Sequence, residues 1–98
     1  MNPIYTITTV RAALAAGSRS VGYFYDLQTA KEAVEENDLD ICECGYYKYA
    51  VIEEVYQGLY TYTFERKEHW YVWNNEKEQY VPCEKPERFK NTYGWSLG

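Results

Sequence analysis

Apolar and polar residues are distributed along the chain in a way that predicts five strands and one main helix. Residues 4–10 and 21–25 are rich in β-branched and aromatic side chains, which is typical of strands. Residues 11–20 lie between them and end in small polar residues, so we expect a loop that joins an antiparallel pair. Residues 47–55 have the strongest strand pattern, centred on residues 50–52, and we expect this strand to lie in the middle of the sheet.

An amphipathic helix is predicted over about residues 27–36. Apolar residues recur at helical spacing from Leu27 to Val34, and charged residues fall on the opposite side. Asp26 is suited to cap the first turn, and Asn37 is suited to end the helix in a left-handed conformation. Because the apolar stripe is narrow and its side chains are small, we expect the helix to lie close against the sheet.

The last part of the chain predicts a hairpin. Residues 70–73 and 79–82 flank a short polar segment, and the proline in the second arm suits an edge strand. Residues 59–64 are a weaker strand candidate, and residues 86–90 predict a helical turn. The sum is one α+β domain over residues 1–98: a small antiparallel sheet, one main helix packed on a face, and a C-terminal hairpin.

The composition raises one question, which is whether the many aromatic side chains lie in the core or at the surface. Aromatic residues make up 18% of the 98 residues, and twelve of them are tyrosine, which is more than a small domain easily buries. Tyrosine and tryptophan are enriched at binding surfaces, but tyrosine also has a high strand propensity. Two interpretations therefore stay open: a binding surface, or rings that fill the core and are covered on the second sheet face or by a symmetric partner.

Charge is unevenly distributed. The formal net charge of −5 argues against general DNA or RNA binding, which needs a basic surface. Residues 1–25 contain two arginines and no acid, whereas residues 26–54 contain nine acids and two lysines. The acidic part is either a solvated helix face or a docking surface for a basic protein patch.

The cysteine pattern and the N-terminus suggest where the protein works. Cys42, Cys44 and Cys83 cannot all pair with one another, and the first ten residues lack the pattern of a signal peptide. No apolar run is long enough to span a membrane. We therefore expect a cytoplasmic protein with free thiols and no membrane association. A C-x-C pair with a single histidine does not have the spacing of a zinc site, so neither a metal nor a cofactor is expected.

The loop between the first two strands carries the first candidate site. Arg11 and Arg19 offer donors suited to phosphate, Ser18 and Ser20 add hydroxyl groups, and Tyr23 could stack on a base. These residues would make a binding site for a nucleotide-sized anion. The loop lacks the spacing of a P-loop, and the alternative is a flexible hairpin loop with two solvated arginines.

The aromatic hairpin carries the second candidate site. Because side chains alternate in a strand, Trp70 points to one side while Tyr71 and Trp73 point to the other. One set fills the core, and Tyr71 and Trp73 would then bind a partner protein. Alternatively both sets are buried by the C-terminal segment, with Trp95 folded over them. His69 is the sole histidine and no nucleophile motif accompanies it, so we expect a surface histidine, no catalytic residue and no enzyme.

The pattern resembles a family of short, largely uncharacterised proteins of gut bacteria and their phages. The residues that carry the resemblance cover most of the chain and are Thr9-Val10-Arg11, Ser18 to Phe24, Ala30, Glu32 to Val34, Asn37, Asp40-Ile41, Glu43, Tyr49 to Glu53, Gly58 to Tyr60, Trp70-Tyr71, Trp73, Pro86-Glu87 and Gly94 to Gly98. The resemblance implies no established activity. It implies a phage or mobile-element setting, in which small non-enzymatic proteins counter host defence. Residues 12–16 are longer and richer in alanine than the family pattern.

Two functions from different classes follow. The first is a homo-oligomeric phage anti-defence sponge in the bacterial cytoplasm, which sequesters a phosphorylated nucleotide immune signal through Arg11, Ser18, Arg19, Ser20 and Tyr23. The second is a protein–protein inhibitor that binds a host defence protein through its aromatic or acidic surface. The acid-free N-terminal part favours the first.

Overall fold

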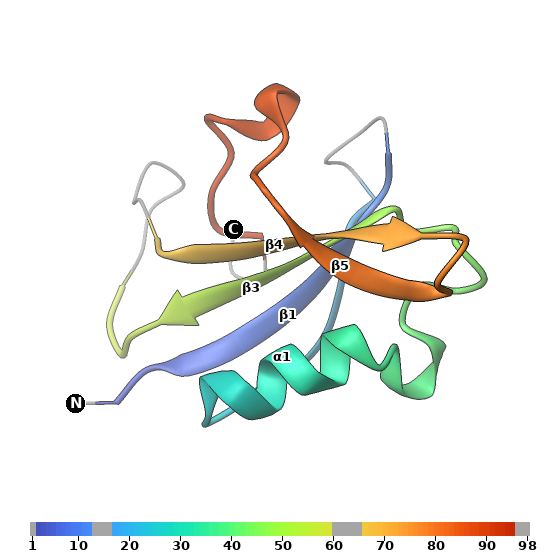
Figure 1. Ribbon diagram of the computed structural model, residues 1–98. Helices are drawn as coiled ribbons and strands as arrows, with labels where there is room; N and C mark the ends of the chain where they lie inside the picture. The colour runs from blue at the N-terminus through green and yellow to red at the C-terminus, as the bar shows by residue number, and fades with distance from the viewer. Residues whose placement is uncertain (1, 13–16, 60–65, 96–98) are drawn as a thin grey trace.

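The computed structural model describes residues 2–12, 17–59 and 66–95 (Figure 1). Its middle layer is an antiparallel five-stranded sheet in the order β2-β1-β3-β4-β5. The strands are β1 (Ile4–Val10), β2 (Arg19–Phe24), β3 (Tyr49–Val55), β4 (Glu68–Asn74) and β5 (Gln79–Cys83). The predicted α+β class is thereby confirmed.

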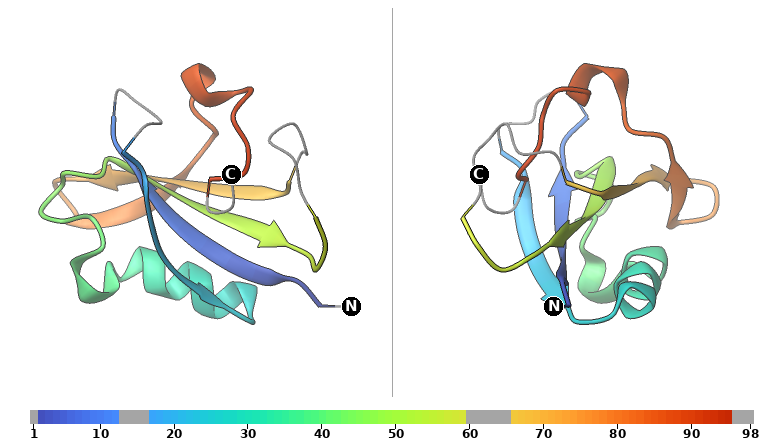
Figure 2. Two further views of the ribbon diagram at one scale, coloured as in Figure 1. Left: turned by 180° about the vertical axis from the view of Figure 1, so that it is seen from behind. Right: turned by 90° about the vertical axis from the view of Figure 1, so that its left-hand side faces the viewer.

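The sheet is covered on both faces. Helix α1 (Leu27–Glu35) lies on one face, and the segment that follows β5 crosses the opposite face, as the two views of Figure 2 show. This segment contains the short 3₁₀ helix η2 (Glu87–Phe89), where a helical turn was predicted. A second 3₁₀ turn, η1 (Asp38–Asp40), directly follows α1.

Strand boundaries match the sequence pattern closely in the centre and less well at the edge. β1 has the predicted bounds, and β3, the middle strand, begins two residues later than predicted. β2 starts at Arg19 and ends at Phe24, one residue short of the predicted end. A bulge near Val21 shifts its register against β1, and such an irregularity leaves no trace in simple alternation. Of the weak strand candidate at residues 59–64, all but Leu59 lies outside the described residues, and Leu59 is fully exposed outside any strand.

The helix is placed by its caps and by its small side chains. The Asp26 carboxylate accepts hydrogen bonds from the backbone N–H and the hydroxyl of Thr29, both at 2.9 Å, and the backbone bond is the main reason that the pKa of Asp26 is lowered. Asn37 ends the helical segment at a φ of 50°. Ala30 and Ala33 are buried against the sheet, because their short side chains allow the helix to approach it closely.

The second sheet face carries an aromatic cluster, which accounts for several of the surplus rings. Trp70 of β4 stacks on Phe89 with ring centroids 5.9 Å apart, and Trp95 meets Trp70 edge-on at 5.3 Å. Val10 and Val51 complete this cluster from β1 and β3. The C-terminal segment therefore covers Trp70 with Trp95, as the second interpretation of the hairpin predicts, but it does not cover Tyr71, which lies on the helix side of the sheet.

A buried carboxylate holds the end of this segment. Glu53 of β3 is fully buried on the second face, and its Oε2 accepts hydrogen bonds from the backbone N–H groups of Gly94 (3.1 Å) and Trp95 (3.2 Å). The Arg66 guanidinium lies 3.6 Å from the same oxygen. Gly94 has a φ of 76°, and a Cβ atom there would lie 2.6 Å from Arg66 Nη1, so only glycine fits without displacing the arginine.

A second carboxylate anchors the middle of the segment. Glu68 lies opposite Glu53 on β4, and its side chain is 5% exposed. Its oxygens accept hydrogen bonds from the indole N–H groups of Trp70 (3.0 Å) and Trp95 (3.2 Å), and Lys85 Nζ lies 2.8 Å away. Burial of a carboxylate is costly unless it is paired and hydrogen-bonded, and both conditions are met here.

We expect Glu53→Gln to lower the free energy of unfolding by roughly 3 kcal/mol, because it removes the buried carboxylate that pairs with the buried Arg66. Glu54→Gln is the matched control. Glu54 is the next residue, faces the helix side, and pairs with His69 and the exposed Lys67, so a loss below about 1 kcal/mol is expected. Urea unfolding followed by tryptophan fluorescence measures both changes. Equal losses in the two variants would contradict the assigned role of Glu53.

Candidate functional site

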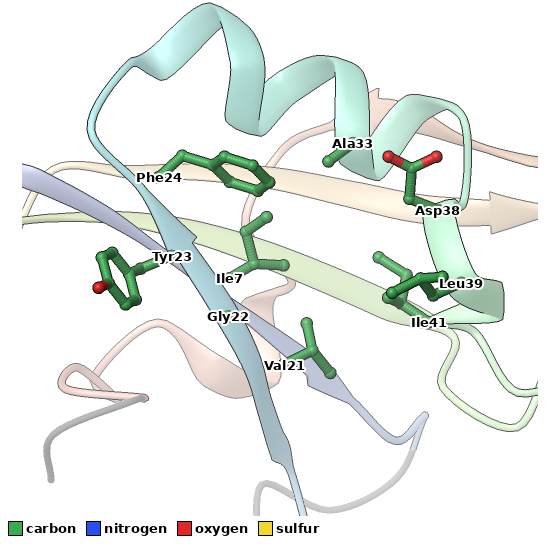
Figure 3. A pocket seen from close by; sticks show the side chains of 9 residues that line it. All are labelled: Ile7, Val21, Gly22, Tyr23, Phe24, Ala33, Asp38, Leu39 and Ile41. Carbon is green, nitrogen blue, oxygen red and sulfur yellow. The ribbon is translucent and has the colours of Figure 1, made fainter.

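An apolar pocket of about 470 Å³ lies between β2 and the end of α1 (Figure 3). The sheet contributes Ile7, Val21 and Phe24, and the helix side contributes Ala33 and Ile41. Asp38 and Leu39 of η1 also line it. Figure 3 shows Tyr23 pointing away from Phe24, to the other side of β2, as expected from the alternation of side chains in a strand.

The turn after α1 holds an apolar side chain out of the core. Leu39 is fully exposed and has a φ of 55°, a conformation that is unusual for a leucine. Asp40 stabilises the turn: its carboxylate accepts hydrogen bonds from the backbone N–H of Cys44 (3.4 Å), the side-chain amide of Asn37 (3.3 Å) and the thiol of Cys42 (3.4 Å). These bonds, that of the Cys44 N–H first, lower the pKa of Asp40. An unfavourable backbone held by a local network is typical of functional sites.

A polar cavity of about 530 Å³ lies on the other side of the same turn. Asp40, Cys44, Trp73 and Glu78 are among the residues that line it. Within the described part of the chain, neither this cavity nor the apolar pocket has a lysine or an arginine in its lining. The surroundings of the turn are therefore apolar on one side and acidic on the other.

Exposed rings continue along β2. Tyr23 is 54% exposed and Tyr25 is 77% exposed, and the two rings meet edge-on at 5.7 Å. β2 is an edge strand, with β1 as its sheet neighbour among the described residues. The pocket and Leu39 lie on the helix side of β2, and the Tyr23 ring lies on the other side of the same edge strand. We call the two sides of this edge together the β2 surface.

The predicted anion-binding residues lie partly near one another. The guanidinium of Arg19 forms an ion pair with Glu43, and that of Arg11 lies 5.0 Å from the ring centroid of Tyr46. Both arginines therefore contact the turn that follows η1, and each already has a partner within the molecule. Arg11, Ser18, Arg19 and Ser20 are not among the residues that line the apolar pocket, although Tyr23 is.

The predicted partner-binding pair is divided by the fold. Tyr71 is 3% exposed in the core beneath α1, and its hydroxyl donates to Glu35 at 3.3 Å. The prediction that Tyr71 lies at a partner-binding surface is wrong, because α1 covers the ring. Trp73 is half-buried near the end of β4, and its indole N–H donates to Asn75 at 2.9 Å. Trp73 lines the polar cavity beside the turn, whereas Tyr71 does not.

The lone histidine has a partner that the sequence did not indicate. His69 is half-buried rather than at the surface, and its Nε2 lies 3.4 Å from an oxygen of Glu54 on the neighbouring strand. Glu68, its neighbour in sequence, points to the opposite sheet face. The pairing arises from the β3–β4 register, in which Ile52 lies opposite His69, and no spacing along the chain reveals it.

Some general features bear on the class of protein. Among the described residues, no group of three or more His, Cys, Asp or Glu side chains is placed to hold a metal ion. The three cysteines are free thiols. In the same part of the chain, no helix has the length and apolar character needed to cross a membrane. No protein-family model, curated protein or solved structure matches the chain, so no function is carried over from a relative.

Sequence reasoning missed the residues that shape the pocket. The acidic part of the sequence, which includes Asp38 and Asp40, predicts either a solvated helix face or a docking surface, and the pattern does not single out Leu39 between them. The available signal was an apolar residue placed between two acids directly after a helix end. Such a leucine cannot continue the buried stripe of α1, so it has to face solvent or a partner.

We expect the buried hydroxyl of Tyr71 to make the folded protein less stable as the pH rises above 10. Burial, and then the nearby Glu35 carboxylate, raise the pKa of Tyr71 from 10.0 to about 12. Between these values the unfolded chain releases the proton while the folded protein keeps it, so stability falls as pH rises through this window. Tyr71→Phe should make the fall in urea-unfolding free energy less steep.

Tyr46→Phe is the control for this titration, because Tyr46 is 54% exposed. Its unfolding free energy should follow that of the unmodified protein across the same pH range. Identical slopes for Tyr71→Phe and the unmodified protein would show that the Tyr71 hydroxyl is accessible to water, against its described burial.

Proposed function

We propose that this chain is a small non-enzymatic binding protein that binds a partner protein by taking one of its apolar side chains into the pocket beside β2. The observation that carries the proposal is the pocket itself, lined almost entirely by apolar residues and bordered by a fully exposed leucine. A volume of about 470 Å³ is within the range of natural binding pockets and accommodates a branched or aromatic side chain.

The exposed residues around the pocket support a protein partner. Leu39 borders the pocket, and the exposed rings of Tyr23 and Tyr25 lie at the same strand edge; exposed aromatic and aliphatic residues of this kind provide much of the binding energy at protein interfaces. Leaving such a cluster in water has a cost that a partner would remove. The resemblance to short proteins of gut bacteria and phages fits a host defence protein as the partner.

The β2 surface suits an apolar group better than a phosphorylated one. The pocket has a carboxylate, Asp38, in its lining and no cation among the described lining residues. A phosphate would be repelled by that carboxylate, whereas an alkyl or aryl group is insensitive to it. The apolar pocket is therefore the basis of the proposed function, and the arginines are a separate site.

The first test uses a minimal apolar probe. In ¹⁵N-correlated NMR spectra, N-acetyl-leucine amide should shift the signals of Val21, Ala33 and Ile41 with millimolar affinity. Leu39→Asn should weaken binding about fivefold because it removes one apolar wall, and asparagine tolerates the left-handed backbone at this position. Leu59→Asn is the matched control, since Leu59 is equally exposed and lies away from the pocket.

The outcome of this titration is decisive either way. Shifts confined to the pocket and reduced only by Leu39→Asn support the proposal. Shifts scattered over the surface, or an equal effect of Leu59→Asn, would mean that the pocket does not select apolar groups.

A nucleotide sponge is the second candidate, favoured by the approach of Arg11 and Arg19 to the same turn. An anion at Arg19 would have to displace the Glu43 carboxylate. If this function is correct, Glu43→Gln should raise the affinity for a cyclic dinucleotide about tenfold, since it removes a competing negative charge. Calorimetric titration of the unmodified protein, Glu43→Gln and Arg19→Ala checks this.

Glu87→Gln serves as the control for the lost charge, because Glu87 pairs with Lys90 in the C-terminal segment. No binding by any of these four proteins would reject the sponge and leave the apolar pocket as the candidate site.

A further inference from the structure

Besides the pocket, the β2 edge presents backbone groups that could pair with an added strand. Because β2 lies at the end of the strand order, its outer backbone groups are not used by a neighbouring strand among the described residues. An exposed strand edge is a template for an added strand, and many peptide-binding proteins use this mode. The apolar pocket lies directly beside that edge, so one ligand can engage both.

We propose that the partner binds as an extended segment added to β2, with an apolar side chain in the pocket and a lysine or arginine next to Asp38. This inference rests on the proposed function and specifies the form of its partner. Backbone hydrogen bonds to β2 would supply affinity, and alternate side chains of the segment would supply specificity.

Gly22 marks the place where a second backbone can approach. It lies in the middle of β2, and apart from Gly22 and its two chain neighbours no described residue has an atom within 4 Å of the position that a Cβ would occupy. A glycine within a strand often marks close approach of another backbone. The opposite edge, β5, contains Pro82, which lacks a backbone N–H and weakens that edge as a template.

The bulge limits the length of the added strand. It lies near Val21, and it turns Val21 and Phe24 toward the same core although they are three positions apart. Regular alternation is therefore available only on the C-terminal side of the bulge, over residues 22–24. A short segment that pairs with these residues is a better fit than a long strand.

Charge identifies the segment as basic. Asp38 is exposed beside the pocket, and its carboxylate has no ion-pair partner among the described residues. The polar cavity behind the turn adds Asp40 and Glu78. Opposite charge at the rim favours a partner with lysine or arginine.

The same charge disfavours a second copy of this chain as the occupant. Each copy carries a net charge of −5, and pairing of two β2 strands would bring two acidic turns together. A basic segment of another protein meets the apolar and the electrostatic features at once.

An unbiased random heptapeptide display on the full chain tests the inference. The enriched peptides should contain an apolar residue and a lysine or arginine two positions away, because residues at that spacing share one face of a strand. The most enriched peptide is then made in two N-methylated forms, each blocking one alternate set of amides. One form should lose about tenfold in affinity and the other should not, since only one set faces β2.

Protein variants test the charge. Asp38→Asn should weaken binding of the enriched peptide about threefold to fivefold and reduce the dependence of binding on salt. Glu76→Gln, in the turn between β4 and β5, is the matched control and should leave affinity unchanged. Both residues are exposed, so neither substitution threatens the fold.

The outcomes separate this inference from the proposed function. Equal effects of the two N-methylated forms would overturn strand addition, and loss of binding in Leu39→Asn would then still support the apolar pocket. Enriched peptides without basic residues, or no enrichment at all, overturn the inference. A dimer at micromolar concentration by light scattering, lost in Tyr23→Lys, would make a second copy the occupant and overturn it as well.

Discussion

Two buried carboxylates determine how this small domain closes its second face. Glu53 and Glu68 lie opposite each other on the two strands β3 and β4, and both are almost inaccessible to water. An ionised group in that position needs hydrogen-bond donors and positive charge, and the C-terminal segment provides the N–H groups of Gly94 and Trp95 together with Lys85. The segment is therefore held across the sheet by specific polar contacts, and the aromatic cluster fills the space beneath it.

This arrangement decides which surfaces remain for binding. One sheet face is covered by α1 and the other by the C-terminal segment, so the broad faces on which small sheets often bind ligands are occupied. The β2 edge and the turn after α1 stay accessible. Placing Tyr23, Tyr25 and Leu39 there, while Trp70, Tyr71 and Tyr80 are buried, separates the rings that stabilise the fold from those that are available to a partner.

The elements could be predicted from the sequence, because their patterns are local. Alternation over residues 4–10, the cap at Asp26 and the polar segment between the arms of the hairpin each specify structure within a few residues. The candidate site could not be predicted in the same way. Its walls come from β1, β2, α1 and η1, and its outermost residue, Leu39, has a left-handed backbone that depends on contacts of Asp40 with residues further along the turn.

The predicted arginine site also could not be judged from the sequence alone. Arg11 and Arg19 stand out in the sequence because no acid lies near them in the chain, yet the fold brings Glu43 and Tyr46 to them from the acidic part. Acidic and basic residues that are separated along the sequence can lie together in the folded protein. Here an acidic turn from the middle of the chain packs against the two arginines. Likewise Tyr71 alternates correctly with Trp70, but alternation does not reveal which face a helix will cover.

The long reach of the Glu53 contacts also has a consequence for folding of the chain. The hydrogen bond from Gly94 to Glu53 joins residues 41 positions apart, and that from Trp95 joins residues 42 apart. Until residues 94 and 95 reach β3, the Glu53 carboxylate has to stay solvated and this part of the sheet face stays hydrated. Closure of the second face therefore depends on contacts of long sequence separation, which form slowly because a long loop must be closed first.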